Sequence, residues 1–362
     1  MALKLLVGTR KGLFMLEDGL GGWAITRHDF VGTPVTSLLH DPRNGMYYAA
    51  LNHGHFGVKL HRSEPGGAAW EEVSPPAFPE GFGGDAAKAP AVSLIWSLAS
   101  GGADRPGQIW AGTIPGALFR SDDRGGSWVL VEGLWLQESR ARWFGGGYDD
   151  PGIHSILIDP RDSDSMVVGI SCGGVWLSRD GGASWTLGGQ GLVAAYMPPE
   201  ARFDPAVQDP HRIVACPAAP DRLWTQHHNG VFRSEDGGAN WSQVVGLPLS
   251  DFGFAVAVHP ARPDTAWFVP AESDEKRIPL DGQFVVTRTR DGGYSFETLR
   301  RGLPLPPAYD LVYRHALEVA PDGKTLAMGS STGSLWTSAD GGEAWQLANA
   351  HLPPIACVTF AT

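Results

Sequence analysis

Histidines recur at two positions in the short apolar runs of this chain, and their spacing indicates a shared site. His154, His211 and His315 each stand six residues before a proline that closes such a run. His55 and His228 each stand two residues before the glycine that opens another. Neutral imidazoles that converge from several strands can ligate a divalent transition metal or act as acids and bases. We therefore predict a metal or acid/base site at these five histidines, against the alternative that each is an ordinary polar residue near a strand end.

Charged and aromatic residues in the longer loops extend this prediction to catalysis and substrate binding. The run 272–277, Glu-Ser-Asp-Glu-Lys-Arg, offers carboxylates for acid/base work and an arginine for an anionic group, although a solvated surface turn has the same composition. Loops 129–153 and 186–210 are long and carry aromatic residues, which is typical of ordered functional loops. The predicted catalytic residues are Asp149, Asp150, Glu272, Asp274, Tyr313 and Arg314. The predicted substrate-binding residues are Arg10, His53, Trp143, Tyr148, Tyr196, His227 and Arg277.

A repeated turn indicates the scaffold that positions these side chains. The pattern Ser-x-Asp-x-Gly-x-x-Trp occurs in four full copies, one conservative variant and two degenerate copies. The copies begin at Asp18, Ser63, Ser121, Ser178, Ser234, Thr289 and Ser338. The aromatic residues that end the seven copies lie 47 to 58 residues apart. Because Ser and Asp side chains bond turn amides and Gly accepts positive φ, we expect these turns to be structural rather than catalytic.

The period of about 50 residues predicts an all-β fold, a seven-bladed β-propeller in which each turn joins the third and fourth strands of a blade. Residues 3–27 supply only three strands, whereas residues 355–361 form an extra strand after the last turn. We therefore expect the C-terminal strand to complete the N-terminal blade and remove its open edge. Residues 1–362 are predicted to form this one domain, with both groups of histidines facing the central axis at its top face.

These turns and their placement resemble the Asp-box, or BNR, propellers, which include sialidases, sortilin-type receptor domains and a photosystem II assembly factor. The resemblance covers essentially the whole chain and is greatest to bacterial glycosyl-hydrolase-like BNR-repeat proteins. Such turns specify the fold rather than the activity. A sialidase-like activity would need an arginine cluster, a Tyr–Glu nucleophile and an acidic Asp. The family's Arg-Ile-Pro sequence belongs near the first strand, but here it occurs at 277–279 in the sixth blade.

Composition limits the partners and the compartment. The counts of 48 Gly, 28 Pro and 14 Trp with 19% charged residues are typical of many short strands separated by turns. A formal net charge of −11 argues against nucleic-acid and anionic membrane surfaces. No apolar segment is long enough for a membrane span or a signal sequence. Three widely spaced cysteines argue against a disulfide framework, so we expect a cytoplasmic protein.

We predict an enzyme of hydrolase or lyase type that acts on a small polar or sugar-like substrate, with a divalent transition metal as its candidate cofactor. No nucleotide-binding or redox-cofactor motif is visible in the sequence. The first alternative is a non-catalytic propeller that binds a ligand or a protein partner. The second is a sialidase-like exo-glycosidase.

Overall fold

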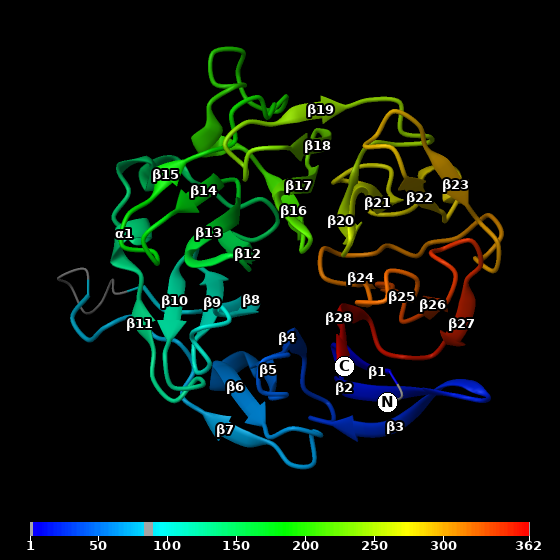
Figure 1. Cartoon of the computed structure of the whole chain (residues 1–362), viewed down its shortest axis with the longest axis horizontal. Coiled ribbons are helices and arrows are strands. Elements are labelled where there is room, and N and C mark those ends of the chain that lie inside the picture. Colours follow the sequence, from blue (N-terminus) through cyan, green and yellow to red (C-terminus); the bar gives the residue numbers. More distant parts are fainter. Residues whose placement is uncertain (1–2, 83–89, 362) are drawn as a thin grey trace. The chain divides into compact units, whose positions relative to one another are not determined.

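The computed structural model describes residues 3–82 and 90–361, which form seven four-stranded antiparallel sheets and almost no helix (Figure 1). This is the seven-bladed β-propeller that the repeat predicts. One sheet joins β28 (Ile355–Ala361) to β1 (Lys4–Thr9), β2 (Gly12–Gly19) and β3 (Gly22–Asp29), so closure of the N-terminal blade by the C-terminal strand is confirmed. None of the helices that the structure describes is long and apolar enough to cross a membrane.

Contacts between residues divide the chain into two compact units. Unit 1 comprises Met1–Gly32, Gly189–Phe203 and Pro210–Thr362. Its sheets are β28-β1-β2-β3 and three sets of four consecutive strands. The first set is β16 (Pro210–Cys216), β17 (Ala219–His227), β18 (Gly230–Ser234) and β19 (Ser242–Val244). The second is β20 (Gly253–His259), β21 (Arg262–Pro270), β22 (Val286–Thr289) and β23 (Glu297–Leu299). The third is β24 (Leu317–Val319), β25 (Leu326–Gly329), β26 (Leu335–Ser338) and β27 (Gln346–Asn349). A short 3-10 helix, η5 (Leu280–Gly282), lies in the loop between β21 and β22.

Unit 2 comprises Thr33–Gly188 and Asp204–Asp209 and holds the other three sheets. The first is β4 (Val35–His40), β5 (Tyr47–Asn52), β6 (Val58–Ser63) and β7 (Glu71–Val73). The second is β8 (Leu94–Ser100), β9 (Ile109–Ile114), β10 (Leu118–Ser121) and β11 (Val129–Leu130). The third is β12 (Gly152–Asp159), β13 (Asp162–Ser171), β14 (Gly174–Ser178) and β15 (Thr186–Leu187). Its helices are short: η1 (Gly54–Phe56), α1 (Glu132–Trp135), η3 (Glu138–Arg142) and η4 (Pro205–Val207).

The repeated turns join the third and fourth strands of their sheets, as predicted. In the turn after β14, the Ser178 hydroxyl accepts the amide hydrogen of Gly182 at 2.9 Å, and the Asp180 carboxylate accepts that of Ser184 at 2.9 Å. Hydrogen bonds from Ser184 hold the pKa of Asp180 below its usual value. Gly182 adopts a φ of 87°, which lets the chain reverse, and the Trp185 indole donates to its carbonyl oxygen. The side chains of the repeat thus build the turn itself.

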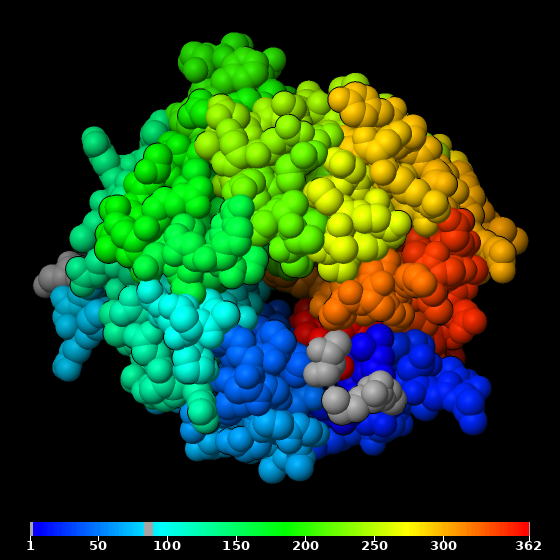
Figure 2. Space-filling view, in the orientation of Figure 1, coloured from blue at the N-terminus to red at the C-terminus, as the bar shows by residue number. Residues whose placement is uncertain are grey.

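Buried tryptophans of the second strands tie neighbouring sheets together in unit 1. Trp224 and Trp267 in unit 1 are 1% exposed. The indole of Trp224 donates to the carbonyl oxygen of Pro263 in the next sheet, and that of Trp267 donates to Gly341 in the sheet after that. The first strands of successive sheets also contact each other, β16 with β20 and β20 with β24, so these sheets pack directly side by side (Figure 2). Residues at the ends of β16, β17 and β20 are therefore neighbours, which positions the site described next.

Candidate functional site

A cluster of aromatic and charged side chains surrounds Phe254 at one end of the unit 1 sheets. Its members are Tyr196, His211, His228, Phe252, Phe254, Asp274, Arg277, Tyr313 and Arg314, which we call the Phe254 cluster. These residues come from the β15–β16 loop, β16, the residue after β17, the start of β20 with the residue before it, the β21–β22 loop and the segment before β24. Seven of the nine were predicted as site residues, and Phe252 and Phe254 are the additions.

His211 forms the buried side of the cluster. It lies in β16, is 1% exposed, and stacks on Phe254 with ring centroids 4.7 Å apart and ring planes 15° apart. Its Nδ1 lies 2.6 Å from the carbonyl oxygen of Gly253 in β20. A carbonyl oxygen only accepts, so Nδ1 carries the hydrogen, and in the neutral ring Nε2 keeps its lone pair. The neighbouring sheet thereby selects the tautomer of His211 and fixes its ring.

His228 forms the more open side of the cluster. It directly follows β17 and is edge-on to His211, with ring centroids 5.5 Å apart. The ring of Tyr196 lies edge-on to His228 at 4.9 Å, and this tyrosine is exposed. The Nε2 atom of His228 is 3.8 Å from a carboxylate oxygen of Asp274 in the β21–β22 loop. An imidazole, a carboxylate and an exposed aromatic ring therefore lie together where solvent can reach them.

Two guanidinium groups approach the ring of Phe254. The Cζ atom of Arg314 is 5.2 Å from the ring centroid, and that of Arg277 is 5.6 Å from it. Arg277 is exposed, and its Nε donates to the backbone carbonyl oxygen of Asp274 at 3.0 Å. Tyr313 packs against the same ring at 5.7 Å. The cations are held by an aromatic ring and a backbone oxygen, an arrangement suited to binding an anionic group of a ligand.

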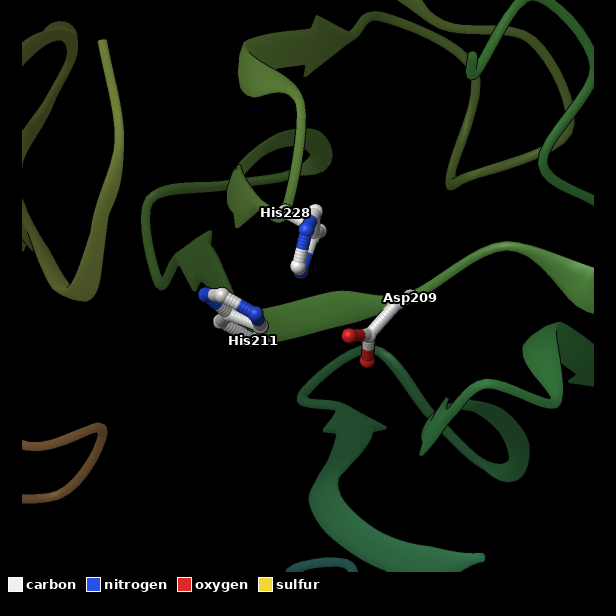
Figure 3. Close-up of side chains that lie close together, drawn as sticks. All are labelled: Asp209, His211 and His228. Atoms are coloured by element: carbon white, nitrogen blue, oxygen red, sulfur yellow. The ribbon is translucent and has the colours of Figure 1, made fainter. Parts of the chain in front are cut away.

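Asp209, the residue before β16, lies close to both histidines (Figure 3). One ligand atom from each of Asp209, His211 and His228 lies within 4.8 Å of the other two. Asp209 is 1% exposed, and its Oδ1 accepts hydrogen bonds from the Ser171 hydroxyl at 3.0 Å and the Cys172 amide at 3.2 Å. Two imidazoles and one carboxylate are a donor set for a transition metal.

The other predicted metal ligands occupy separate surroundings and are not part of this group of three. His154 is fully buried in β12, where its Nδ1 is 2.9 Å from the Ser155 hydroxyl oxygen. His55 is exposed in η1. His315 forms an isolated backbone bridge with Cys357, and its carbonyl oxygen accepts from Val358. Their roles as ligands stay predictions.

The remaining predicted residues of unit 2 lie in two loops, four of them after η3 and one before η1. Trp143 is buried against Trp176 at 5.7 Å. Tyr148 is exposed and edge-on to Trp96, and Asp149 and Asp150 are also exposed. His53 is the residue before η1. Their catalytic and binding roles stay predictions.

Three further predicted residues lie in unit 1. Glu272 pairs with Lys276 across the loop at 2.8 Å. His227 is fully buried, and its Nδ1 accepts the amide hydrogen of Asn229. Arg10 is exposed in the turn between β1 and β2, where its amide donates to Pro354. Glu272 is thus paired within its own loop, whereas the carboxylate of Asp274 in the same loop lies near His228.

Asp209 and Phe254 are site residues that were not predicted from the sequence. Asp209 directly precedes β16, and Phe254 stands six residues before Pro260, the same position that His211 occupies before Pro217. The signal for Phe254 was therefore present in the histidine spacing. The histidine spacing does not point to Asp209, because its position beside His228 depends on how β16 pairs with β17.

Comparison with known proteins identifies solved structures that have the same fold. No family model matches the chain. A segment of 153 residues, 37% of this chain, is 28% identical to a xyloglucanase of Acetivibrio thermocellus but spans only 16% of that relative. The GH74 xyloglucanase structure from Xanthomonas campestris matches 96% of this chain and 52% of its own length, with a TM-score of 0.65 and 17% identity. The periplasmic gluconolactonase of Pseudomonas aeruginosa matches 100% of this chain and 99% of its own length, with a TM-score of 0.63 and 11% identity. At these identities the likeness shows that the chain shares the β-propeller fold of these proteins.

Proposed function

We propose that the Phe254 cluster is the active site of a hydrolase that cleaves a C–O bond in a small carbohydrate-like substrate bearing an anionic group. The observation that carries the proposal is that two guanidinium groups and His211 contact the Phe254 ring, while His211 also contacts His228, which in turn lies near the Asp274 carboxylate. A xyloglucanase and a gluconolactonase are among the similar proteins, and both names denote hydrolases of carbohydrate substrates. The repeated turns support assignment to the Asp-box propellers, and the three buried cysteines, which form no disulfide, support a cytoplasmic location.

Each charged group of the cluster has a role in this reaction. Arg277 and Arg314 hold the anionic group, because a planar guanidinium pairs with a carboxylate or phosphate through two parallel hydrogen bonds. The exposed ring of Tyr196 offers an apolar face to a sugar ring. Asp274 accepts a proton from the attacking water, the hydroxide oxygen bonds to the electrophilic carbon, and the leaving oxygen takes a proton from solvent as the C–O bond breaks.

A panel of matched substrates tests the proposal. 4-Nitrophenyl glucuronide and 4-nitrophenyl glucoside differ by one carboxylate, and 6-phosphogluconolactone and gluconolactone differ by one phosphate. We expect the anionic member of at least one pair to be hydrolysed with the higher kcat/KM. Asp274→Asn should lower kcat by roughly 100-fold or more, whereas Arg277→Gln should mainly raise KM for the anionic substrate.

Glu275→Gln is the matched control, because Glu275 is exposed in the same loop. It should leave both kinetic constants unchanged. Hydrolysis that is equally fast with Asp274→Asn would contradict the assigned role of this carboxylate. Tight binding of these compounds without turnover would instead support the ligand-binding propeller.

A further inference from the structure

We propose that Asp209, His211 and His228 together bind one divalent transition-metal ion (Figure 3). The inference concerns the site of the proposed function but does not require hydrolysis, because a metal can be bound and measured without any substrate. Four features of the described residues support it: the strand register, the tautomer of His211, the orientation of Asp209 and the chemistry of the donor set.

The register of one β-ladder brings the three residues together. β16 and β17 pair in antiparallel fashion, with Pro210 opposite His227. The next pair beyond the end of this ladder places Asp209 opposite His228, since antiparallel partners advance in opposite directions. A register shift follows between Pro210 and Arg212, which lies at His211. A β-bulge re-aims the side chain at that position, and such bulges are common next to functional sites.

The hydrogen bond of His211 prepares the ring for a metal. Its Nδ1–H donates to the Gly253 carbonyl oxygen at 2.6 Å, so Nε2 carries the lone pair of the neutral ring and is the nitrogen that we assign to the metal. Metal-bound histidines almost always donate their second ring N–H to a carbonyl or carboxylate oxygen, and this contact orients the ring and raises its basicity. Stacking on Phe254 holds the plane of the ring as well.

Two donors orient the carboxylate of Asp209 in the same manner. The Ser171 hydroxyl and the Cys172 amide both bond to Oδ1, so the rotation of the carboxylate is set without using Oδ2 in these two bonds. Cys172 reaches Asp209 with a φ of 47°, a left-handed conformation that is uncommon for a residue other than Gly. Backbone strain of this kind persists where the surrounding structure holds it, and it is enriched at ligand-binding sites.

The donor set selects the class of metal. Two imidazole nitrogens and one carboxylate oxygen suit Zn²⁺, Fe²⁺, Co²⁺ or Ni²⁺, whereas Ca²⁺ and Mg²⁺ prefer oxygen ligands alone. In a tetrahedral zinc site with bonds of about 2.0 Å, ligand atoms lie roughly 3.3 Å apart. The ligand atoms, which now lie within 4.8 Å of one another, must therefore move closer together when the ion binds. Three protein ligands leave a coordination position for water or substrate, as in catalytic zinc sites.

Cobalt is a direct probe, because coordinated Co²⁺ absorbs visible light. Untagged protein is stripped with EDTA, dialysed and titrated with Co²⁺ and, by calorimetry, with Zn²⁺. We expect one equivalent to bind at micromolar or lower concentration. Asp209→Asn and His228→Ala should each weaken binding by roughly 100-fold or more, and Ser171→Ala by about tenfold through the loss of carboxylate orientation.

His351→Ala removes an exposed histidine elsewhere in unit 1 and is the matched control, which should bind like the wild type. Circular dichroism and the metal-free unfolding midpoint establish that each variant folds. The inference is overturned if the wild type binds no stoichiometric metal, or if folded Asp209→Asn and His228→Ala proteins bind it as tightly as the wild type. A protein that binds cobalt but hydrolyses nothing would contradict the proposed function alone, and one that hydrolyses without binding metal would contradict this inference alone.

Discussion

Glu318 makes the stability of unit 1 depend on pH. It lies in β24, where burial raises its pKa from 4.5 to about 7. Hydrogen bonds from the Phe360 backbone and the Thr359 side chain, together with the Arg212 charge, act in the opposite direction without cancelling the effect of burial. The folded protein therefore binds the Glu318 proton more tightly than the unfolded chain does, so stability is complete below about pH 4.5 and falls as the pH rises toward 7.

The size of this loss follows from the two pKa values. Their difference corresponds to about 3 kcal/mol, and partial contact of Glu318 with solvent reduces this to about 2 to 3 kcal/mol. Urea denaturation of the wild type should therefore show a lower free energy of unfolding at pH 8 than at pH 5. In Glu318→Gln, which cannot ionise, the difference between the two pH values should shrink by about 2 to 3 kcal/mol.

Glu64→Gln is the control, because Glu64 is exposed in a turn and should leave the pH dependence as it is. Comparison within each variant between two pH values cancels any loss of packing or of the Arg212 partner. If Glu318→Gln and the wild type lose the same free energy between pH 5 and pH 8, the buried carboxyl does not hold its proton and the reasoning is refuted.

Two further predictions concern the turns and the cysteines. Ser178→Ala removes the hydroxyl that accepts two amide hydrogens of its turn, so the free energy of unfolding should fall by about 1 to 3 kcal/mol, whereas Ser242→Ala at an exposed position should change it by less than about 0.5 kcal/mol. The thiols of Cys172, Cys216 and Cys357 are buried, and burial raises the pKa of Cys357 to about 12, so Ellman's reagent should find none of them in the folded protein and all three in guanidinium. Rapid labelling of folded protein would show that these side chains are open to solvent.

The sequence predicted the fold because the repeated turn is local. Ser178, Asp180 and Gly182 bond one another within five residues, so their spacing in the sequence is already the geometry of the turn. The extra strand after the last copy indicated its pairing with β1, because a sheet of three strands leaves one edge open. The assignment of residues 1–362 to one domain stays a prediction.

The site was predictable only in part because its contacts are not local. The spacing rule found His211 and His228, and the charged loop contributed Asp274 and Arg277. The rule could not show that His211 stacks on Phe254, since these residues are 43 positions apart and meet through two different sheets. The place of Asp209 in the site depends on the register of β16 and β17. A shift of one residue in that ladder would turn its side chain to the opposite face of the sheet.

The pairing of β28 with β1 has a consequence for how the protein is made. β1 leaves the ribosome long before its partner β28, which is synthesised only after β2 to β27. At about 5 to 20 residues per second, the hydrogen-bonding groups along that edge wait roughly 20 to 70 s for their partner. During this interval the nascent chain presents an unpaired strand that can recruit the same strand of a neighbouring polypeptide, so its yield in the cell should depend on chaperones that shield this edge.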